Sequence, residues 1–545
     1  MRVSNPGSQT AARAWAIALF ASIVPVASAA ATKCESLAAL ALPNTSITSA
    51  EARPAGDFTP PEGRPIPNLP AFCRVVGSLK PSTDSDIRFE VWMPSSGWNG
   101  KFQGIGNGGF AGSISFAGLA NAVSHGYAAG STDTGHQAAG TDAHWALRHP
   151  EKIIDFGYRA IHETTAAAKA IVNRFYGDAP SHSYFNSCSN GGRQALMEAQ
   201  RFPADYDGIV AGAPANNWTH LLALAASNLR ATLAEAASYI PAAKLPAIES
   251  AALGACDARD GVKDGVIENP RQCGFDPSVL LCKGPESDTC LTQPQLAALQ
   301  KLYLGLQDSK GRWIFPGYSP GGEAEAGGWA SWITGPAPEK SLMFAFGTQF
   351  YKNMVYDDPD WRFQTFDADR DTKAADDKAA RFLNATDPDL GQFQKRGGKL
   401  IVYHGWSDAA IPAANAIDYY QSVVSKMGAR NAGALLRLYM VPGMEHCGGG
   451  AGPNSFGQAG VGSGDRLHDI DTALEAWVEK GIAPERIVAT QYVSGSNPQS
   501  GVARTRPLCP YPQVARWKGT GSTDDAANFV CAAPGPVPSS GPKGN

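Results

Sequence analysis

Ser189 is the first residue of this chain whose surroundings indicate chemistry. It follows the segment 183–187, which is interpreted as a brief strand, and precedes residues 194–201, whose spacing predicts a helix. A sharp strand-to-helix turn would lift its hydroxyl above the edge of a sheet. Such a turn needs small residues two positions before and after the serine, and Ser187 and Gly191 meet this need. Because Ser187 replaces the usual first glycine of G-x-S-x-G, an ordinary helix N-cap serine stays an alternative.

Two later residues are suited to serve a serine nucleophile. Asp408 comes just after the apolar segment 400–403, and His446 follows the segment 435–441. This chain order, serine, acid, histidine, is typical of one class of hydrolases. His446 would take the serine proton, and Asp408 would hold the imidazole tautomer and stabilise the imidazolium. The alternatives are a turn aspartate and a loop histidine.

Ester or amide chemistry also needs donors where the carbonyl oxygen becomes negative. The backbone N–H of Asn190 is one candidate, and Gly108 or Gly109 in a glycine-rich turn is the other. Glycine would let the backbone approach a substrate closely, whereas the alternative is a plain turn.

The elements that would position these residues alternate along the chain. Strand patterns occur at 73–77, 87–93, 101–105, 127–133 and 183–187, with a helical pattern over 153–175. The rhythm stops between 219 and 396 and resumes with 399–405, 413–427 and 435–441. The alternation predicts an α/β class protein with a mostly parallel sheet. Together with the serine turn, this alternation indicates an α/β-hydrolase fold whose domain is formed by two parts of the chain, residues 30–218 and 397–545. A large lid domain is inserted between them at 219–396 and is called the insert below.

The first 29 residues have the features of a signal peptide. Arg2 and Arg13 precede an apolar run over 14–26, and Ala27-Ser28-Ala29 has the spacing of a cleavage site. A membrane anchor is disfavoured because Pro25 interrupts a run shorter than the ~20 residues of a span. We therefore expect a secreted or periplasmic protein. A net charge of −4 and a pI near 6.2 argue against nucleic-acid binding.

The chain has ten cysteines, and an even number in a chain that is expected to be exported predicts five disulfides. Neighbouring cysteines such as 256 and 273, 282 and 290, or 509 and 531 would close short loops, but the spacing leaves the connectivity open. A zinc site is a weaker interpretation because no CxxC or HxxxH spacing accompanies them.

Cys188-Ser189 together with His446-Cys447 resembles the tannase and feruloyl esterase family. The resemblance extends to residues 106–110, 212–215 and the cysteine-rich insert. It implies a disulfide between Cys188 and Cys447 that ties the serine to the histidine. It also implies the pairs Cys34–Cys73, Cys256–Cys273, Cys282–Cys290 and Cys509–Cys531.

The insert opens with an acidic loop that suits a hard cation. Asp257, Asp260 and Asp264 would repel one another unless Ca²⁺ gathered them, with the carbonyls of Val262 and Val266. A solvated acidic turn is the alternative on spacing alone, and the family resemblance favours a structural calcium, remote from the serine. No organic cofactor is expected.

Aromatic residues of the insert could form a wall for an aromatic acyl group. They are Trp329, Trp332, Phe344, Phe346, Phe350 and Tyr351. The alternative is that they form the core of the insert. The main hypothesis is hydrolysis of esters of hydroxybenzoic or hydroxycinnamic acids, with small aromatic esters as partners and neither membrane nor nucleic acid. A second hypothesis is hydrolysis of mono(2-hydroxyethyl) terephthalate or related phthalate monoesters, although no arginine of the insert matches the carboxylate-binding one of such enzymes. A third is an inactive, calcium-stabilised exported binding protein.

Overall fold

The structure is a computed structural model that describes residues 1–4, 7, 32–61, 63–458, 464–495 and 497–535. The expected signal peptide, residues 1–29, lies almost wholly outside the described residues. Within them, no helix combines the length and the apolar character needed to cross a bilayer.

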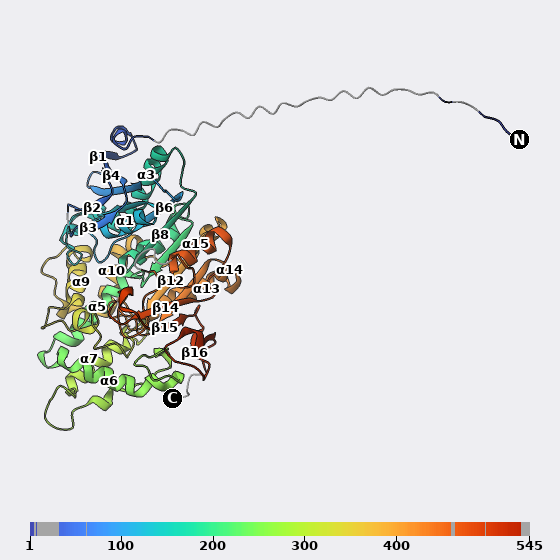
Figure 1. Cartoon of the computed structure of the whole chain (residues 1–545). Coiled ribbons are helices and arrows are strands. Elements are labelled where there is room, and N and C mark those ends of the chain that lie inside the picture. The colour runs from blue at the N-terminus through green and yellow to red at the C-terminus, as the bar shows by residue number, and fades with distance from the viewer. Residues whose placement is uncertain (5–6, 8–31, 62, 459–463, 496, 536–545) are drawn as a thin grey trace.

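The described residues form one nine-stranded mixed sheet (Figure 1). Its first four strands in spatial order, β1, β4, β5 and β7, pair antiparallel, and the rest pair in parallel. The alternation of strands and helices thus predicted the parallel half correctly. The order is β1 (Thr45–Arg53), β4 (Phe72–Leu79), β5 (Ile87–Pro94), β7 (Ala128–Thr132), β6 (Lys101–Ile105), β8 (His182–Cys188), β9 (Gly208–Gly212), β12 (Lys399–Gly405) and β13 (Leu436–Val441).

Helices cover both faces of this sheet, and the strand period decides which residues meet them. In β12, Leu400 and Val402 belong to the core shared with α3 (Ala160–Tyr176), α4 (Asn190–Arg201) and α13 (Ala414–Met427). Ile401 and Tyr403 point to the opposite core, shared with α1 (Phe116–Ser124) and α15 (Ile470–Lys480). Because successive side chains of a strand alternate in direction, an unbroken apolar run is what a strand buried on both faces requires.

The segment between Cys34 and Ala71 contains strands that its proline and turn content did not predict. It holds the edge strand β1, together with β2 (Gly56–Phe58) and β3 (Ile66–Leu69). Most side chains of β1 are exposed or half-buried. Pairing with β4, rather than an apolar pattern of its own, therefore makes this segment a strand.

The insert is mainly helical and has its own apolar core, which continues into residues 110–156. Its helices gather beside the sheet around α5 (Figure 1). The longer ones are α5 (Trp218–Leu233), α6 (Leu245–Cys256), α7 (Gln293–Leu304), α9 (Leu342–Phe350) and α10 (Ala368–Ala375). The insert also holds β10 (Leu306–Gln307), β11 (Trp313–Phe315), α8 (Trp329–Trp332), α11 (Arg381–Leu383) and α12 (Gly391–Lys395). Outside the insert lie α2 (Pro150–Ile154), α14 (Ala429–Leu435), β14 (Ile487–Tyr492), β15 (Val502–Leu508), β16 (Val514–Trp517) and β17 (Phe529–Ala532).

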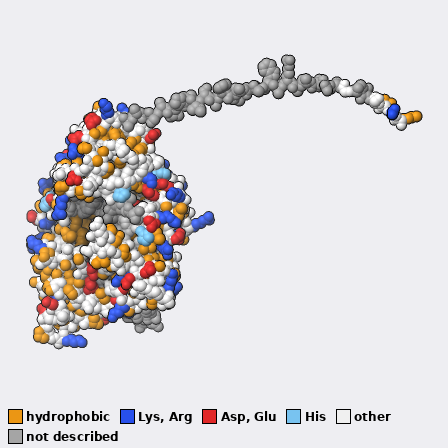
Figure 2. All heavy atoms as spheres, viewed as in Figure 1, with side chains coloured by type: hydrophobic (Ala, Val, Ile, Leu, Met, Phe, Trp, Pro, Cys, Tyr) orange, Lys and Arg blue, Asp and Glu red, His pale blue; other side chains and the backbone are white. Residues whose placement is uncertain are grey.

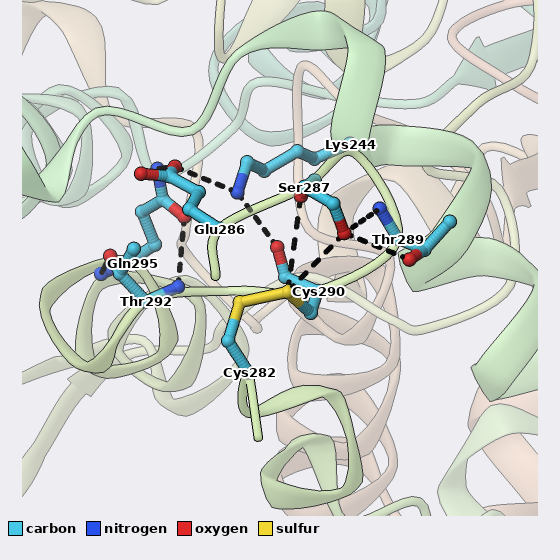
Figure 3. The surroundings of a disulfide bond; sticks show 8 residues. All are labelled: Lys244, Cys282, Glu286, Ser287, Thr289, Cys290, Thr292 and Gln295. Carbon is cyan, nitrogen blue, oxygen red and sulfur yellow. Dashed lines mark hydrogen bonds and ion pairs between the residues drawn. A yellow bond between two sulfur atoms is a disulfide. The ribbon is translucent and has the colours of Figure 1, made fainter. Parts of the chain in front are cut away.

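A disulfide and a buried lysine close the loop that precedes α7 (Figure 3). Cys282 bonds to Cys290, whose carbonyl oxygen accepts a hydrogen bond from Lys244 Nζ at 2.7 Å. The same ammonium pairs with Glu286 Oε1 at 2.9 Å, and Thr292 begins α7 with a capping box to Gln295. The loop is thus fixed by local contacts as well as by the sulfur bridge.

All ten cysteines form disulfides, in the five pairs that the family resemblance implies. Charges of both signs are scattered over the face shown in Figure 2, without a large patch of one sign among the residues described there.

Candidate active site

Ser189 occupies a strained turn between β8 and α4. Its φ and ψ are 66° and −125°, a conformation that costs a serine roughly 1–3 kcal/mol. The neighbouring backbone fixes this conformation, because Ser189 N–H donates to Gly212 O and Ser189 O accepts from Ala215 N–H. Ser189 is the N-cap of α4 by position, yet its hydroxyl makes no capping hydrogen bond. The geometry therefore favours a nucleophile elbow over a simple cap.

Only glycine fits on the helical side of this turn. A Cβ added to Gly191 would lie 1.9 Å from Ser187 Oγ, and one added to Gly192 would lie 2.3 Å from Gly212 O. The loose match to G-x-S-x-G thus still gives a close-packed elbow, since Ser187 fills the space that a side chain at 191 would need.

A buried arginine, which the sequence analysis missed, anchors the elbow helix. Arg193 is 0% exposed and donates to Asn190 Oδ1 and to the carbonyls of Phe156 and Gly157, at 2.8–2.9 Å. Burial lowers the pKa of Arg193 to about 9. Among the described residues no carboxylate pairs with Arg193, so these neutral acceptors provide the hydrogen bonds of the desolvated guanidinium and fix the start of α4.

The acid and the histidine meet in the loops after β12 and β13. His446 Nδ1 lies 2.8 Å from Asp408 Oδ2, and Asp408 Oδ1 accepts from the N–H groups of Ala410 and Ile411. Burial disfavours the Asp408 carboxylate, but His446 and His404 outweigh it, so the pKa of Asp408 lies below its usual range. The carboxylate is therefore charged at neutral pH and can orient the imidazole through Nδ1.

The disulfide between Cys188 and Cys447 joins the two loops that carry Ser189 and His446. The Cα atoms of the two cysteines are 6.0 Å apart, and each cysteine is the chain neighbour of one candidate catalytic residue. Residues that are 259 positions apart in the sequence are thereby linked covalently beside the site.

Ser189 opens into an apolar pocket under the insert. Trp332 lines this pocket, and its ring also packs edge-on against the His446 imidazole, with ring centroids 5.0 Å apart. No charged side chain is among the lining residues, which are Gly109, Ser189, Ala215, Trp218, Leu221, Leu222, Ala225, Tyr318, Trp332, Met343, Phe346, Ala409, Ala410 and Ile411. The site is suited to a flat, uncharged acyl group.

Only part of the predicted aromatic wall reaches this pocket. Trp332 and Phe346 line it, whereas Trp329, Phe344 and Phe350 lie in the core of the insert, as does Tyr351. Trp329 packs between Tyr303 and Tyr318. The α5 residues of the pocket were not anticipated, because a buried apolar helix face gives no sequence signal for which residues face a cavity.

Of the two glycines proposed as oxyanion donors, Gly109 lines the pocket with Ser189. Its φ is 56°, and a Cβ there would lie 2.3 Å from Gly140 O, so the turn requires glycine. Gly108 lies beside it, and its carbonyl accepts from Ala111 N–H. Asn190 is the first residue of α4, where a backbone N–H has no intrahelical acceptor.

Glu445, the residue before His446, is a buried acid that the sequence analysis did not single out. It is 2% exposed, and neither carboxylate oxygen makes a well-formed hydrogen bond within the described residues. Its side chain lies against the insert, since a Cβ added to Gly328 would be 2.9 Å from Glu445 Oε1. Burial, followed by the charge of Asp408, raises the pKa of Glu445 to about 10, so it is neutral at pH 7.

Among the described residues, the three aspartates of the acidic loop do not form a close group of ligand atoms, although several acids of this region line one pocket. Asp260, Asp264 and Glu268 line one small pocket with Val266, and burial raises the pKa of Asp260 to about 6 and that of Glu268 to about 8. Asp257 accepts from the N–H groups of Asp264 and Gly265. Carboxylates are the donors that a hard cation prefers, but Asp257, Asp260 and Asp264 would have to draw together to bind one.

Two arginines also reach this loop. Arg504 and Arg506 of β15 contact the Asp264 carboxylate, which they partly neutralise. The loop also touches the segment that leads to His446, because a Cβ added to Gly443 would lie 3.1 Å from Val266 Cγ1.

Proteins of known family resemble this chain over most of its length. A family model for tannase and feruloyl esterase matches residues 73–532. An uncharacterized esterase of Xanthomonas campestris pv. campestris is 44% identical over 540 residues, covering 94% of this chain and 93% of that protein. A mono(2-hydroxyethyl) terephthalate hydrolase of Piscinibacter sakaiensis is 37% identical over 535 residues, covering 86% and 85%. The crystal structure of feruloyl esterase B from Aspergillus oryzae is 30% identical with a TM-score of 0.85, covering 92% of this chain and 99% of that one. This likeness confirms the predicted α/β-hydrolase fold.

Proposed function

The chain belongs to the tannase and feruloyl esterase family and is a carboxylic ester hydrolase; from this premise we propose that it cleaves esters of aromatic acids through Ser189, His446 and Asp408. One observation carries the proposal. The Asp408–His446 hydrogen bond lies beside an uncharged pocket into which a serine in elbow geometry opens.

In the first half of the reaction, His446 Nε2 removes the proton as Ser189 Oγ attacks the ester carbonyl carbon. The N–H groups of Asn190 and of Gly109 or Gly108 stabilise the oxygen that becomes negative. The tetrahedral intermediate then releases the alcohol, which takes its proton from His446, and leaves the acid bound to Ser189 as an ester.

In the second half, His446 removes a proton from water as the water oxygen attacks the acyl carbon. The bond to Ser189 Oγ breaks, the serine regains its proton from His446, and the free acid leaves. Asp408 stays ionised throughout and holds the imidazole, consistent with its lowered pKa.

The acyl group is that of a hydroxybenzoic or hydroxycinnamic acid. Trp218, Trp332 and Phe346 supply aromatic surface for a flat ring. Relatives named as probable feruloyl esterases support this class, among them one from Aspergillus terreus that is 32% identical over 513 residues.

The second candidate is a terephthalate monoester, favoured by the likeness to the Piscinibacter sakaiensis enzyme. Its free carboxylate would enter a pocket with no cationic lining residue. Burying an unpaired carboxylate costs several kcal/mol, so we place this substrate second.

Turnover of four esters tests the assignment. We expect methyl ferulate to be turned over with a higher kcat/KM than mono(2-hydroxyethyl) terephthalate, and methyl gallate reports on the benzoate class. The methyl ester of the terephthalate substrate is its uncharged control, and it should be cleaved faster than the monoacid. If the monoacid were cleaved faster than its methyl ester, the assignment to hydroxybenzoic or hydroxycinnamic esters would give way to the second candidate.

The nucleophile is tested separately. S189A should lose activity towards all these esters and should not react with a fluorophosphonate probe that labels the parent protein. If the parent protein itself stayed unlabelled and inactive, the third candidate, an inactive exported binding protein, would replace an esterase.

We also propose that the acidic loop of the insert holds a structural Ca²⁺. Asp257, Asp260 and Asp264 would bind it, with the carbonyls of Val262 and Val266. When bound, the ion supplies only positive charge that offsets the repulsion among these carboxylates. The contact of Val266 with Gly443 supports an indirect effect on the loop of His446.

Export to an oxidising compartment is a further part of the proposal. Five disulfides support it, because such bonds are rare in reducing compartments. Protein recovered from the periplasm or the medium should begin at Ala30, and intact Met1 on protein from those fractions would contradict this.

A further inference from the structure

A second cluster of ligand-type side chains lies at the far end of the elbow helix from Ser189. His162 comes from α3, Glu198 from the last turn of α4, and Asp205 from the loop that follows. Within the described part of the chain, one ligand atom of each lies within 4.8 Å of those of the other two. The proposed esterase mechanism uses none of these residues.

The carboxylates of this cluster lack enough donors. Glu198 is 1% exposed, and within the described ranges neither of its oxygens makes a well-formed hydrogen bond. Its carboxyl group faces that of Asp205, and burial followed by the charge of Asp205 raises the pKa of Glu198 well above its usual range. Two facing carboxyl groups require a proton or a cation between them.

The positive charge near the cluster is insufficient to replace such a cation. Lys169 lies beside the cluster, and its Nζ donates to the backbone carbonyl of Asp205. It faces the carboxylates of Glu198, Asp205 and Asp207, and the charge of Arg396 also reaches it, so this positive charge is shared among three acids.

We propose that His162, Glu198 and Asp205 bind a divalent transition-metal ion, for which Zn²⁺ is the appropriate probe. An imidazole with two carboxylates is a donor set that suits zinc and its neighbours better than calcium, which prefers oxygen alone. The site is thus chemically different from the acidic loop of the insert.

The geometry requires only a small adjustment. In tetrahedral zinc with bonds of about 2.0–2.1 Å, ligand atoms are roughly 3.3 Å apart. His162 Nδ1 lies 2.6 Å from Asp205 Oδ2, so this pair would open slightly while Glu198 moves inward. The His162 ring is stacked on Phe202, with ring centroids 3.8 Å apart, which orients it.

The cluster is open enough for an ion to enter. The side chains of His162 and Asp205 are 34% and 15% exposed, and water could therefore complete the coordination. A bound ion would join α3 to the end of α4 and to the loop that leads to β9. It would stabilise the folded chain because these ligands come from separate elements.

Zinc binding to the full mature chain tests this proposal. Protein stripped with a chelator is returned to buffer with excess Ca²⁺, which saturates any calcium site, and is then titrated with ZnCl₂. We expect one equivalent of zinc by elemental analysis after dialysis and a rise in Tm. E198Q, which mimics the protonated acid, should bind roughly tenfold or more weakly.

H162A is the second variant, in case E198Q changes the local packing. H144A is the matched control, because His144 forms an exposed pair with Asp142 at 2.7 Å that should not hold an ion. Loss of the equivalent in E198Q and H162A but not in H144A supports the site. The proposal is overturned if the parent protein retains no zinc and its Tm does not change, or if all variants bind equally. In the first case, a shared proton holds the two carboxyl groups together.

Discussion

Removing the disulfide that joins the loops of Ser189 and His446 should impair turnover more than its effect on stability explains, if the proposed triad is the active site. The change is C188A/C447A. It breaks the link between the chain neighbours of Ser189 and His446, while the Asp408–His446 hydrogen bond is left in place. We expect kcat to fall and KM to change little, because the serine and the imidazole lose their fixed separation.

The stability effect can be worked out from the sequence separations. The chain-entropy relation gives about 5.5 kcal/mol for the 259-residue separation of Cys188 and Cys447. The same relation gives about 2.5 kcal/mol for the 8-residue separation of Cys282 and Cys290. These values correspond to a loss in Tm of roughly 5 °C and 2 °C for a chain of this length that unfolds as one unit.

C282A/C290A is therefore the control, since its loop stays fixed by Lys244 and the capping box of α7 (Figure 3). The assay is hydrolysis of methyl ferulate at 20 °C below each variant's own Tm. We expect roughly a 10- to 100-fold lower kcat for C188A/C447A, as a misplacement of about 1 Å can cause, and an almost unchanged kcat for the control. A fully folded C188A/C447A protein with the parent kcat would refute the idea that this bond positions the proposed catalytic residues Ser189 and His446.

Three further predictions concern Glu445, the elbow and the acidic loop. The folded protein keeps the Glu445 proton up to a pKa of about 10, whereas the unfolded chain releases it near 4.5. Between these values the free energy of unfolding should fall as pH rises, by up to about 1.4 kcal/mol per pH unit, and E445Q should lack this loss. Urea unfolding at about pH 6 and about pH 9 measures it, and equal losses in both proteins would argue against a buried neutral acid. G191A should lose roughly 100-fold or more in kcat/KM, because the added Cβ would clash with the side chain of Ser187. S187G/G191A should recover part of the lost kcat/KM. If it recovers none, the clash with Ser187 is not the cause of the loss. Chelation of Ca²⁺ should lower the Tm of the parent protein; an unchanged Tm together with no bound calcium by elemental analysis would end the calcium proposal.

Much of the candidate site could be predicted because its residues carry local signals. The elbow lies within six consecutive residues, and its small side chains are required by the turn itself. Asp408 and His446 follow predicted strands, and parallel strands place the residues at their carboxyl ends along one edge of the sheet. The order of the strands therefore predicts that the loops carrying Ser189, Asp408 and His446 lie close together.

Other features had no local signal. β1 is a strand because β4 offers its edge, although its own side chains are mostly solvent-facing. Arg193 and Glu445 would be surface charges by residue type, and only packing shows that both are buried.

The sequence by itself determined the fold class, the elbow and the residues available for catalysis, because periodicity, glycine positions and chain order follow from local backbone constraints. Only the tertiary structure decided which aromatic side chains of the insert face the pocket: Trp332 does, and Trp329 does not. It also brought His162, Glu198 and Asp205 together. The physical reason is that hydrophobicity and charge say whether a side chain tends to be buried, whereas its neighbours depend on how distant segments pack.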